Sequence, residues 1–176
     1  QSWIAYEYQT LELLHAAGAD VPKPYVMERN SILMGYVGDL EFAAPTLNFV
    51  TLDRDEAREL FDRVVLNLNL LLQNERIHGD LSAYNILYWD GDITLIDFPQ
   101  VVCPEGIPLA LTIFLRDVTR ICQYFQAQGV KVNPRNLAAD LWTSHGHKII
   151  KEADPRHLDA EDKADRKLWE KQMNPR

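Results

Sequence analysis

Residues 76–100 read RIHGDLSAYNILYWDGDITLIDFPQ, and this stretch carries the strongest structural signal of the chain. Its centre is Asp90-Gly91, which stands between short apolar runs at residues 86–89 and 93–96. Because Asp-Gly fits the positive backbone angles of a tight two-residue turn, this pattern predicts a β-hairpin. The hairpin turns the chain back on itself. Residues just before its first strand and just after its second strand are therefore expected to lie close together.

Three oxygen-bearing side chains flank the predicted hairpin. Asp80 and Asn85 precede its first strand, and Asp97 ends its second strand. Two carboxylates and one amide suit a hard cation such as Mg²⁺, which binds oxygen ligands. Phosphoryl transfer needs a carboxylate to orient the attacking hydroxyl and further oxygen ligands to hold metal against nucleotide phosphates. An isolated Asp-x-x-x-x-Asn is also a common turn former, so the flanking sequence has to decide between these interpretations.

Hydrophobic spacing outlines helices on both sides of this stretch. We expect them at residues 2–17, 54–74, from about 108 to 128, and 137–142. Asp53 and Glu56 form a capping-box-like pair at the start of the second helix. Residues 21–24 (VPKP) are expected to be extended, and residues 31–37 (SILMGYV) to form a buried strand. From Lys151 onward, both charge signs are dense and apolar residues are few, which favours a solvated tail.

The composition is that of an ordinary globular domain, with 176 residues, 47% hydrophobic, 25% charged and a net charge of −8. No apolar run reaches the ~18 residues of a membrane span, and no secretory signal is visible, so we expect a cytoplasmic protein without membrane contact. The acidic balance argues against non-specific nucleic-acid binding. Cys103 and Cys122 are expected to be free thiols. The His145 and His147 pair lacks the further ligands of a structural zinc site.

The polar pattern matches a known motif set. Protein kinases carry H-R-D-x-x-x-x-N followed, after a hairpin, by D-F-G. Here residues 78–80 read HGD, Asn85 follows, and residues 97–99 read DFP. The departures are Gly for Arg and Pro-Gln in place of the final Gly. They resemble the RIO kinase family, in which H-x-D-L-S-x-x-N and I-D-x-x-Q are typical, as in residues 78–85 and 96–100.

The resemblance to RIO kinases extends over about residues 3–140. Trp3 with Glu7 resembles the early W-x-x-x-E helix of the family, and VPKP, LMGYVG and APTL follow in the expected order. FLRDVTRICQYFQAQGV at residues 114–130 resembles the next helix. The resemblance implies an α+β, protein kinase-like fold. Its expected parts are a remnant of the N-terminal lobe (residues 1–37), a mainly helical C-terminal lobe with the catalytic-loop hairpin (38–150) and a charged tail (151–176).

The same resemblance implies roles for the polar residues. Asp80 is the expected catalytic carboxylate, and Ser82 is expected to contact the γ-phosphate of ATP. Asn85 and Asp97 are expected to bind Mg²⁺, with Mn²⁺ as a substitute. RIO proteins are credited with phosphorylating their own metal-site Asp during ATP hydrolysis, and by resemblance this is Asp97.

Nucleotide contacts are implied for four further residues. Met34, Tyr36 and Val37 correspond to the strand and hinge behind the adenine, although a plain core strand explains the same residues. Glu7 corresponds to the helix Glu that pairs with a strand Lys gripping the phosphates. An exposed surface Glu is the alternative. Asp117 is expected either to brace the catalytic loop from below or to form a surface ion pair.

The implied reaction is transfer of the ATP γ-phosphoryl group to a serine or threonine of an unidentified protein acceptor, or ATP hydrolysis with autophosphorylation. One alternative is a small-molecule phosphotransferase of the aminoglycoside or choline kinase type, where a His would replace Ser82. The other is a non-catalytic ATP-binding module. No Gly-rich loop or strand Lys precedes Glu7, so we expect an N-terminally truncated chain with little activity alone. Its first helix is expected to expose Ile4, Tyr8 and Leu11.

Overall fold

The computed structural model describes residues 3–107, 109–149 and 154–156. The described residues form an α+β arrangement of four α-helices and two antiparallel two-stranded sheets. The helices are α1 (Trp3–Ala16), α2 (Arg54–Gln73), α3 (Ala110–Ala127) and α4 (Pro134–Ser144). The strands are β1 (Pro24–Glu28), β2 (Ser31–Met34), β3 (Ile86–Trp89) and β4 (Asp92–Leu95). Apart from residues 154–156, the expected charged tail lies outside the described residues.

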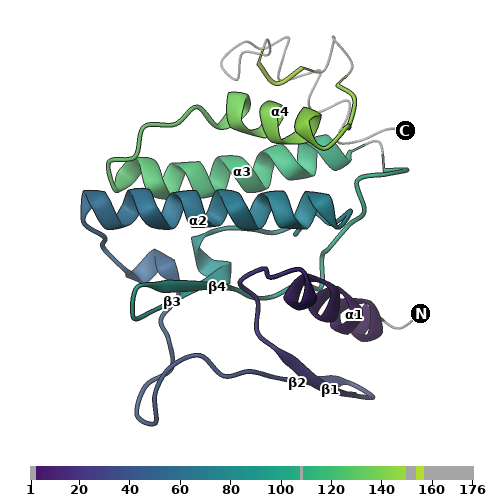
Figure 1. Ribbon diagram of the computed structural model, residues 1–176, viewed down its shortest axis with the longest axis vertical. Helices are drawn as coiled ribbons and strands as arrows, with labels where there is room; N and C mark the ends of the chain where they lie inside the picture. Colours follow the sequence, from purple (N-terminus) through teal and green to yellow (C-terminus); the bar gives the residue numbers. More distant parts are fainter. Residues whose placement is uncertain (1–2, 108, 150–153, 157–176) are drawn as a thin grey trace.

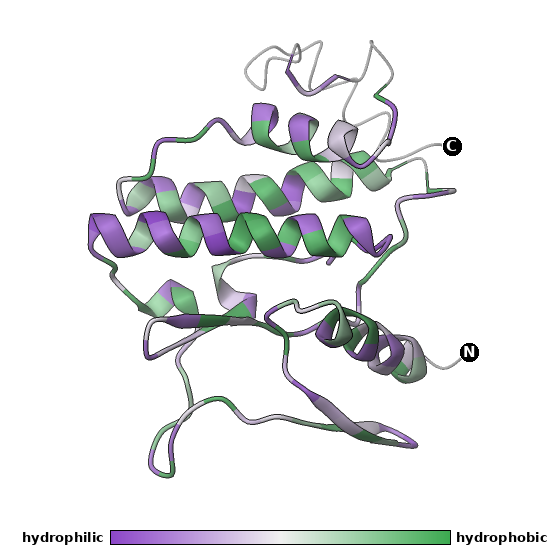
Figure 2. Cartoon of the chain, in the orientation of Figure 1, coloured by the Kyte–Doolittle hydropathy of each residue, from purple (hydrophilic) through white to green (hydrophobic). Residues whose placement is uncertain are grey.

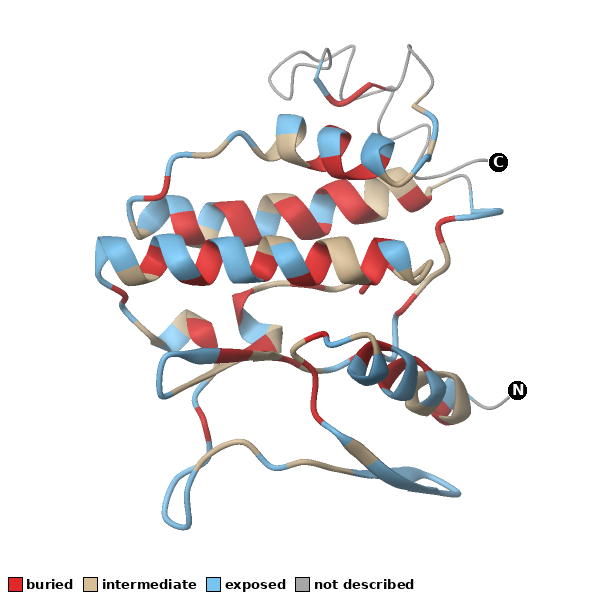
Figure 3. Cartoon of the chain, viewed as in Figure 1, coloured by how far each residue is buried: buried red, intermediate tan, exposed pale blue. Residues whose placement is uncertain are grey.

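Helices α2, α3 and α4 lie side by side, and the β3–β4 hairpin lies between α2 and the β1–β2 ribbon (Figure 1). The facing sides of α2 and α3 are hydrophobic and buried (Figures 2 and 3). Phe61 of α2 meets Phe125 of α3 edge to face, with ring centroids 5.3 Å apart. Phe114 of α3 packs against Trp142 of α4 at 5.8 Å. Aromatic contacts of this kind add stability beyond the burial of area, so they join the three helices into one core.

The predicted hairpin is confirmed. Strands β3 and β4 pair in register from Ile86 opposite Leu95 to Trp89 opposite Asp92. Asp90 and Gly91 have φ angles of 50° and 83°, the positive values that a two-residue hairpin turn requires. The second strand begins one residue earlier than expected, at Asp92.

Helix α2 begins where the capping pattern predicts, but the capping box is only half formed. The Asp53 side chain accepts hydrogen bonds from the backbone N–H groups of Asp55 and Glu56 at 3.0 and 2.9 Å. The Glu56 carboxylate instead accepts a hydrogen bond from the hydroxyl of Tyr88 on β3. The first turn of α2 is thereby linked to the hairpin.

A buried polar network fixes the turn after α1. Asn67 of α2 is fully buried, and its amide accepts from the backbone N–H of Asp20 and donates to the Asp20 carboxylate, both at 2.7 Å. Arg63 donates to the same carboxylate at 2.5 and 2.6 Å. The Asp20 carbonyl accepts from Leu95 N–H of β4 at 2.7 Å. Because buried polar groups are stabilising only when paired, this network fixes α1 beside the hairpin.

Two expectations about the N-terminal part are wrong. The strand at residues 31–37 ends at Met34, and its residues alternate between exposed and half-buried. Ile4 and Leu11 of α1, expected to be exposed, are 5% and 1% exposed. Exposed apolar side chains lie on the β1–β2 ribbon (Tyr25, Val26, Met27 and Leu33), in the segment that follows it (Leu40, Phe42 and Phe49) and at the start of α1 (Trp3).

Helix α4 is longer than residues 137–142. The Asn133 side chain accepts from the backbone N–H groups of Arg135 and Asn136, so the helix begins at Pro134. This N-cap supplies partners for backbone donors that the helix leaves unpaired. The two cysteines are free, as expected. Within the described ranges, no helix combines the length and the apolar character of a membrane span.

Candidate active site

The loop that follows α2 is held in place by α3. Gly79 has a φ of 85°, and a Cβ built there would lie 2.1 Å from the Gln100 carbonyl oxygen, so another residue fits only if the backbone moves. The Gly79 N–H donates to Asp117 Oδ2 at 2.8 Å. Its carbonyl accepts from the Arg116 guanidinium. The Arg that protein kinases carry at this point of the motif would therefore collide with the Gln100 backbone here.

Asp117 braces the loop from within the core, which confirms the first of its two expected roles. Its side chain is 1% exposed, and Arg116 Nη2 lies 3.6 Å from its Oδ1. Burial raises the pKa of Asp117 to about 6, opposed by the Gly79 hydrogen bond and by the Arg116 charge. A carboxylate placed in this way rigidifies the loop backbone while remaining sensitive to pH.

His78 connects the loop to the end of β4. Its Nε2 lies 3.0 Å from the Ile96 carbonyl oxygen, which can only accept, so Nε2 carries the proton. Its Nδ1 is then free to accept from Asp80 N–H, at a longer 3.4 Å. Burial lowers the pKa of His78, which favours this neutral form. The His78 ring also packs on Phe98, with centroids 4.6 Å apart. One buried side chain thus contacts the residues on both sides of Asp97, the backbone of Ile96 and the ring of Phe98, as well as Asp80.

Asn85 and Asp97 both lie at the open end of the hairpin. The backbone N–H of Ile96 donates to the Asn85 carbonyl at 3.0 Å, which places Asp97 one residue from this pairing. Asn85 Nδ2 donates to the Asp80 carbonyl at 2.8 Å, so its Oδ1 is directed away as an available ligand. Asp97 is exposed and has a φ of 68°. Within the described part of the chain, no hydrogen bond or ion pair engages its carboxylate.

The oxygen atoms of Asn85 and Asp97 fit a magnesium ion whose other ligands are phosphate oxygens and waters. No three His, Cys, Asp or Glu side chains of the described residues are grouped to hold a metal by themselves. Mg²⁺ commonly takes one or two protein oxygens and completes its shell with phosphates and waters. The Asn85 amide oxygen and the Asp97 carboxylate are of the required type.

Glu7 reaches the segment that follows β4. Its Oε1 accepts from Phe98 N–H at 3.3 Å, so α1 is tied to the residue next to Asp97. Partial burial raises the pKa of Glu7, and the nearby Asp97 charge raises it further. The half-buried position of Glu7 argues against an ordinary surface Glu.

A cavity of about 560 Å³ lies beside Asp80. Asp80, Ser82 and Asn85 line it together with Arg120 and Tyr124. Arg120 Nη1 donates to Asp80 Oδ1 at 2.7 Å. The Ser82 hydroxyl accepts from Tyr84 N–H at 3.3 Å and caps a short 3₁₀ turn, η2 (Ala83–Asn85), which leaves its own O–H free to donate. Three of the predicted site residues therefore share one cavity wall.

The predicted hinge residues lie on a separate segment. Met34 and Val37 are half-buried, and Tyr36 is 67% exposed. Gly35 N–H donates to the Lys23 carbonyl at 2.8 Å, and the Val37 carbonyl accepts from Ala44 N–H at 3.0 Å. The backbone of this segment is therefore ordered, although its described residues do not line the cavity beside Asp80.

Two arginines of α3 contact the loop, and neither contact was predicted from the sequence. Arg116 donates to the Gly79 carbonyl and Arg120 to the Asp80 carboxylate. Their spacing of four residues places them on one face of the helix, so helical periodicity could have paired them. Local sequence does not show which other segment of the chain these arginines contact.

The fold defines the class of the protein. A crystal structure of a kinase domain superposes with a TM-score of 0.54 at 13% identity, covering 96% of this chain and 71% of that one. The protein therefore has a protein kinase-like fold. The RIO domain family matches residues 1–137. With that match over most of its length, the chain belongs to the RIO domain family.

Curated relatives carry the same family name. The chain is 30% identical over 135 residues to the RIO-type serine/threonine-protein kinase Rio1 of Thermoplasma acidophilum, covering 77% of this chain and 69% of that protein. It is 30% identical over 133 residues to the human serine/threonine-protein kinase RIO1, and 30% identical over 137 residues to Rio1 of Haloferax volcanii. The chain spans only 23% of the human protein and 46% of the Haloferax protein.

Proposed function

We propose that this chain forms most of the phosphoryl-transfer site of a RIO-type serine/threonine protein kinase that uses ATP and Mg²⁺. The observation that carries the proposal is a set of hydrogen bonds that joins Asp80 to the residue before Asp97. His78 bonds to the Asp80 N–H and to the Ile96 carbonyl, and Asn85 bonds to the Asp80 carbonyl and to the Ile96 N–H. In this proposal residues 1–37 belong to the N-terminal lobe and residues 38–150 form the C-terminal lobe. Mn²⁺ is expected to substitute for Mg²⁺.

Asp80 is the proposed catalytic carboxylate. Arg120 engages its Oδ1, and its Oδ2 is left to accept the hydrogen bond of an acceptor hydroxyl. Its backbone is held on both sides, by His78 Nδ1 at the N–H and by Asn85 Nδ2 at the carbonyl. Positioning of this kind raises the rate because the hydroxyl is held in line with the phosphoryl group before reaction.

Asn85 and Asp97 are the proposed metal ligands. When bound, Mg²⁺ would offset the negative charge of the nucleotide phosphates. Glu7 supports this site because its hydrogen bond to Phe98 N–H fixes the segment that carries Asp97. Glu7 Oε2 remains to receive a lysine side chain.

The remaining contacts are proposed for the nucleotide itself. In the proposal Ser82 donates to a phosphate oxygen, because its hydroxyl accepts from Tyr84 N–H and keeps its own O–H for a ligand. Met34, Tyr36 and Val37 would border the adenine, with backbone groups making the polar contacts. ATP hydrolysis through phosphorylation of Asp97 is a second candidate, since this carboxylate is exposed and unengaged by the described residues.

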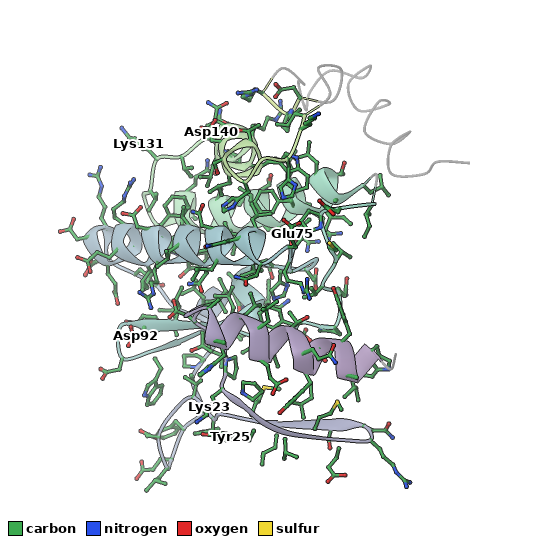
Figure 4. All side chains as sticks on the ribbon, turned by 45° about the vertical axis from the view of Figure 1, so that its right-hand side comes forward. Lys23, Tyr25, Glu75, Asp92, Lys131 and Asp140 are labelled. Carbon is green, nitrogen blue, oxygen red and sulfur yellow. The ribbon has the colours of Figure 1, made fainter. Side chains whose placement is uncertain are left out.

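The test uses the full-length protein that contains this chain, with radiolabelled ATP, Mg²⁺ and a library of serine and threonine peptides. The parent protein is expected to transfer label to peptide, and Asp80→Ala to lose on the order of 10²-fold or more of that rate while binding ATP within a few-fold. Asp140→Asn, at an exposed position on α4 (Figure 4), is the control. Undiminished transfer by Asp80→Ala would contradict the proposal.

A further inference from the structure

The cavity beside Asp80 has a wall that the proposed reaction leaves unused. In addition to the catalytic-loop residues, α3 contributes three side chains to it: Arg120, Gln123 and Tyr124. Its volume of about 560 Å³ is within the usual range for a ligand site. Because it opens next to the Asp80 carboxylate, a peptide that presents a hydroxyl to Asp80 has to pass along this wall.

Arg120 is the cation of this wall. One of its donors is used at Asp80 Oδ1, at 2.7 Å. A guanidinium has five N–H donors, and the Arg120 side chain is 42% exposed, so donors remain beyond the one that Asp80 engages. Arg116, one turn earlier on α3, is already engaged with the Gly79 carbonyl and the Asp117 carboxylate. Arg116 does not line the cavity, so Arg120 is the one of these two arginines whose remaining donors can meet a ligand there.

The charged residues around the cavity determine which charge a ligand there should carry. Among the described lining residues, Asp80 carries the negative charge and Arg120 the compensating positive charge, and the others are neutral. An incoming lysine or arginine would compete with the acceptor hydroxyl for Asp80 Oδ2. An incoming carboxylate would meet the unused guanidinium donors, which match carboxylates in geometry as well as charge.

We propose that Arg120 is a specificity-determining residue that selects serine or threonine acceptors with an acidic side chain close by in the peptide. This inference rests on the proposed kinase function and names the substrate class of the same site. The guanidinium lies directly beside Asp80, and an extended peptide advances ~3.3 Å per residue. The acidic side chain is therefore expected within about two residues of the acceptor.

Neutral groups complete the wall on either side of Arg120. The Tyr124 hydroxyl donates to the Val50 carbonyl at 2.9 Å, which holds its ring in place, and burial raises its pKa to about 12. Tyr84, which is 67% exposed, also lines the cavity. These rings can pack against a peptide without adding charge, so the discrimination between peptides falls to Arg120.

The experiment measures kcat/KM of the full-length protein on matched serine peptides in which Glu, Gln or Lys occupies each of the three positions before and after the serine. At the favoured position, the parent protein is expected to prefer Glu over Gln by about tenfold or more, the usual strength of a charge-assisted contact. Arg120→Gln should reduce this ratio to about 1, Arg120→Lys should retain part of it, and Arg120→Glu should favour Lys over Glu. Lys131→Gln, which removes an equal charge at an exposed position outside the cavity (Figure 4), should keep the parent ratio.

Each outcome decides the proposal. Equal rates on all peptides would overturn the role of Arg120 and leave the proposed kinase function intact. The same loss of preference in Lys131→Gln would also overturn it, because the effect would then come from net charge. If no peptide is phosphorylated although ATP is hydrolysed, both this inference and the protein-kinase function are wrong. Because Arg120→Lys keeps the charge at an exposed position, it separates loss of specificity from loss of folding.

Discussion

The backbone N–H of Gly79 donates to the buried carboxylate of Asp117 at 2.8 Å, so the loop that carries Asp80 is fixed to α3 across 38 residues of sequence. The bond joins a left-handed backbone position that favours glycine to a carboxylate with little access to water. Stability and loop geometry therefore depend on the same contact.

Asp117 should give the protein a measurable dependence on pH. Its pKa is raised from 3.8 to about 6, so the folded state binds this proton more tightly than the unfolded chain does. The stabilisation is fully present below pH ~4 and is lost as pH rises through 6. A shift of roughly 2 pKa units corresponds to about 3 kcal/mol. Asp117→Asn, which cannot titrate, should therefore gain up to that amount relative to the parent between pH 4 and pH 7.

Urea unfolding at a series of pH values measures this difference. Asp140→Asn on α4 is the matched control, since Asp140 is exposed. Its stability relative to the parent should stay flat over the same range. Parallel curves for the parent and Asp117→Asn would mean that the Asp117 carboxylate is not held as the structure places it.

Gly79→Ala should be far more costly than a glycine substitution without a close neighbour. The added Cβ would lie 2.1 Å from the Gln100 carbonyl oxygen, so the loop or the segment after β4 has to move. Gly146→Ala has a similar φ of 82° but nothing within 4 Å of the added Cβ. The control should lose only the ~1–2 kcal/mol of a left-handed residue.

We expect Gly79→Ala to lose more than ~3 kcal/mol of unfolding free energy, or to keep its fold with a displaced loop and impaired transfer. Urea unfolding and peptide phosphorylation by the full-length protein distinguish these outcomes. Similar costs for the two variants, with transfer retained, would show that the Gln100 backbone is not in contact with the loop.

Short sequence patterns predicted the helices and the hairpin. They could not predict the site contacts that join residues distant in the sequence. The hairpin was predictable because Asp90-Gly91 defines its own turn, and α2 because Asp53 caps the helix that follows it. The capping box was only half right because Glu56 bonds to Tyr88, 32 residues away.

The same limit explains the errors at the ribbon and in the cavity. The apolar residues at 31–37 predicted a buried strand, but Leu33 is 61% exposed. The sequence alone does not say which element, if any, covers a strand. The ion pair of Arg120 with Asp80 joins residues 40 apart, so no local motif contains it. Motif resemblance located Asp80, Asn85 and Asp97, and their roles remain predictions.

Asp97→Asn should weaken Mg²⁺-dependent ATP binding in the full-length protein. The Asp97 carboxylate is exposed, and the described residues give it no other partner, so its charge is available to a metal. Asn keeps the shape but removes the charge that a hard cation needs. Because the substitution breaks no described contact, fold stability should change by less than ~0.5 kcal/mol. Calorimetric ATP titrations with and without Mg²⁺ measure the effect, and equal Mg²⁺ dependence in parent and variant would remove Asp97 from the metal site.

The 176-residue chain, studied by itself, should self-associate through the β1–β2 ribbon. Val26 and Leu33 are paired across the two strands and are 45% and 61% exposed, and an exposed apolar pair of this kind favours association. The ribbon is also a short two-stranded sheet whose free edges can pair with another chain. Val26→Lys combined with Leu33→Lys should therefore shift the chain toward monomer in light scattering. Leu66→Lys replaces a single exposed leucine on α2, 45% exposed, and should leave the distribution of masses unchanged. A monomeric parent chain, or an equal effect of Leu66→Lys, would mean that the ribbon is not the associating surface.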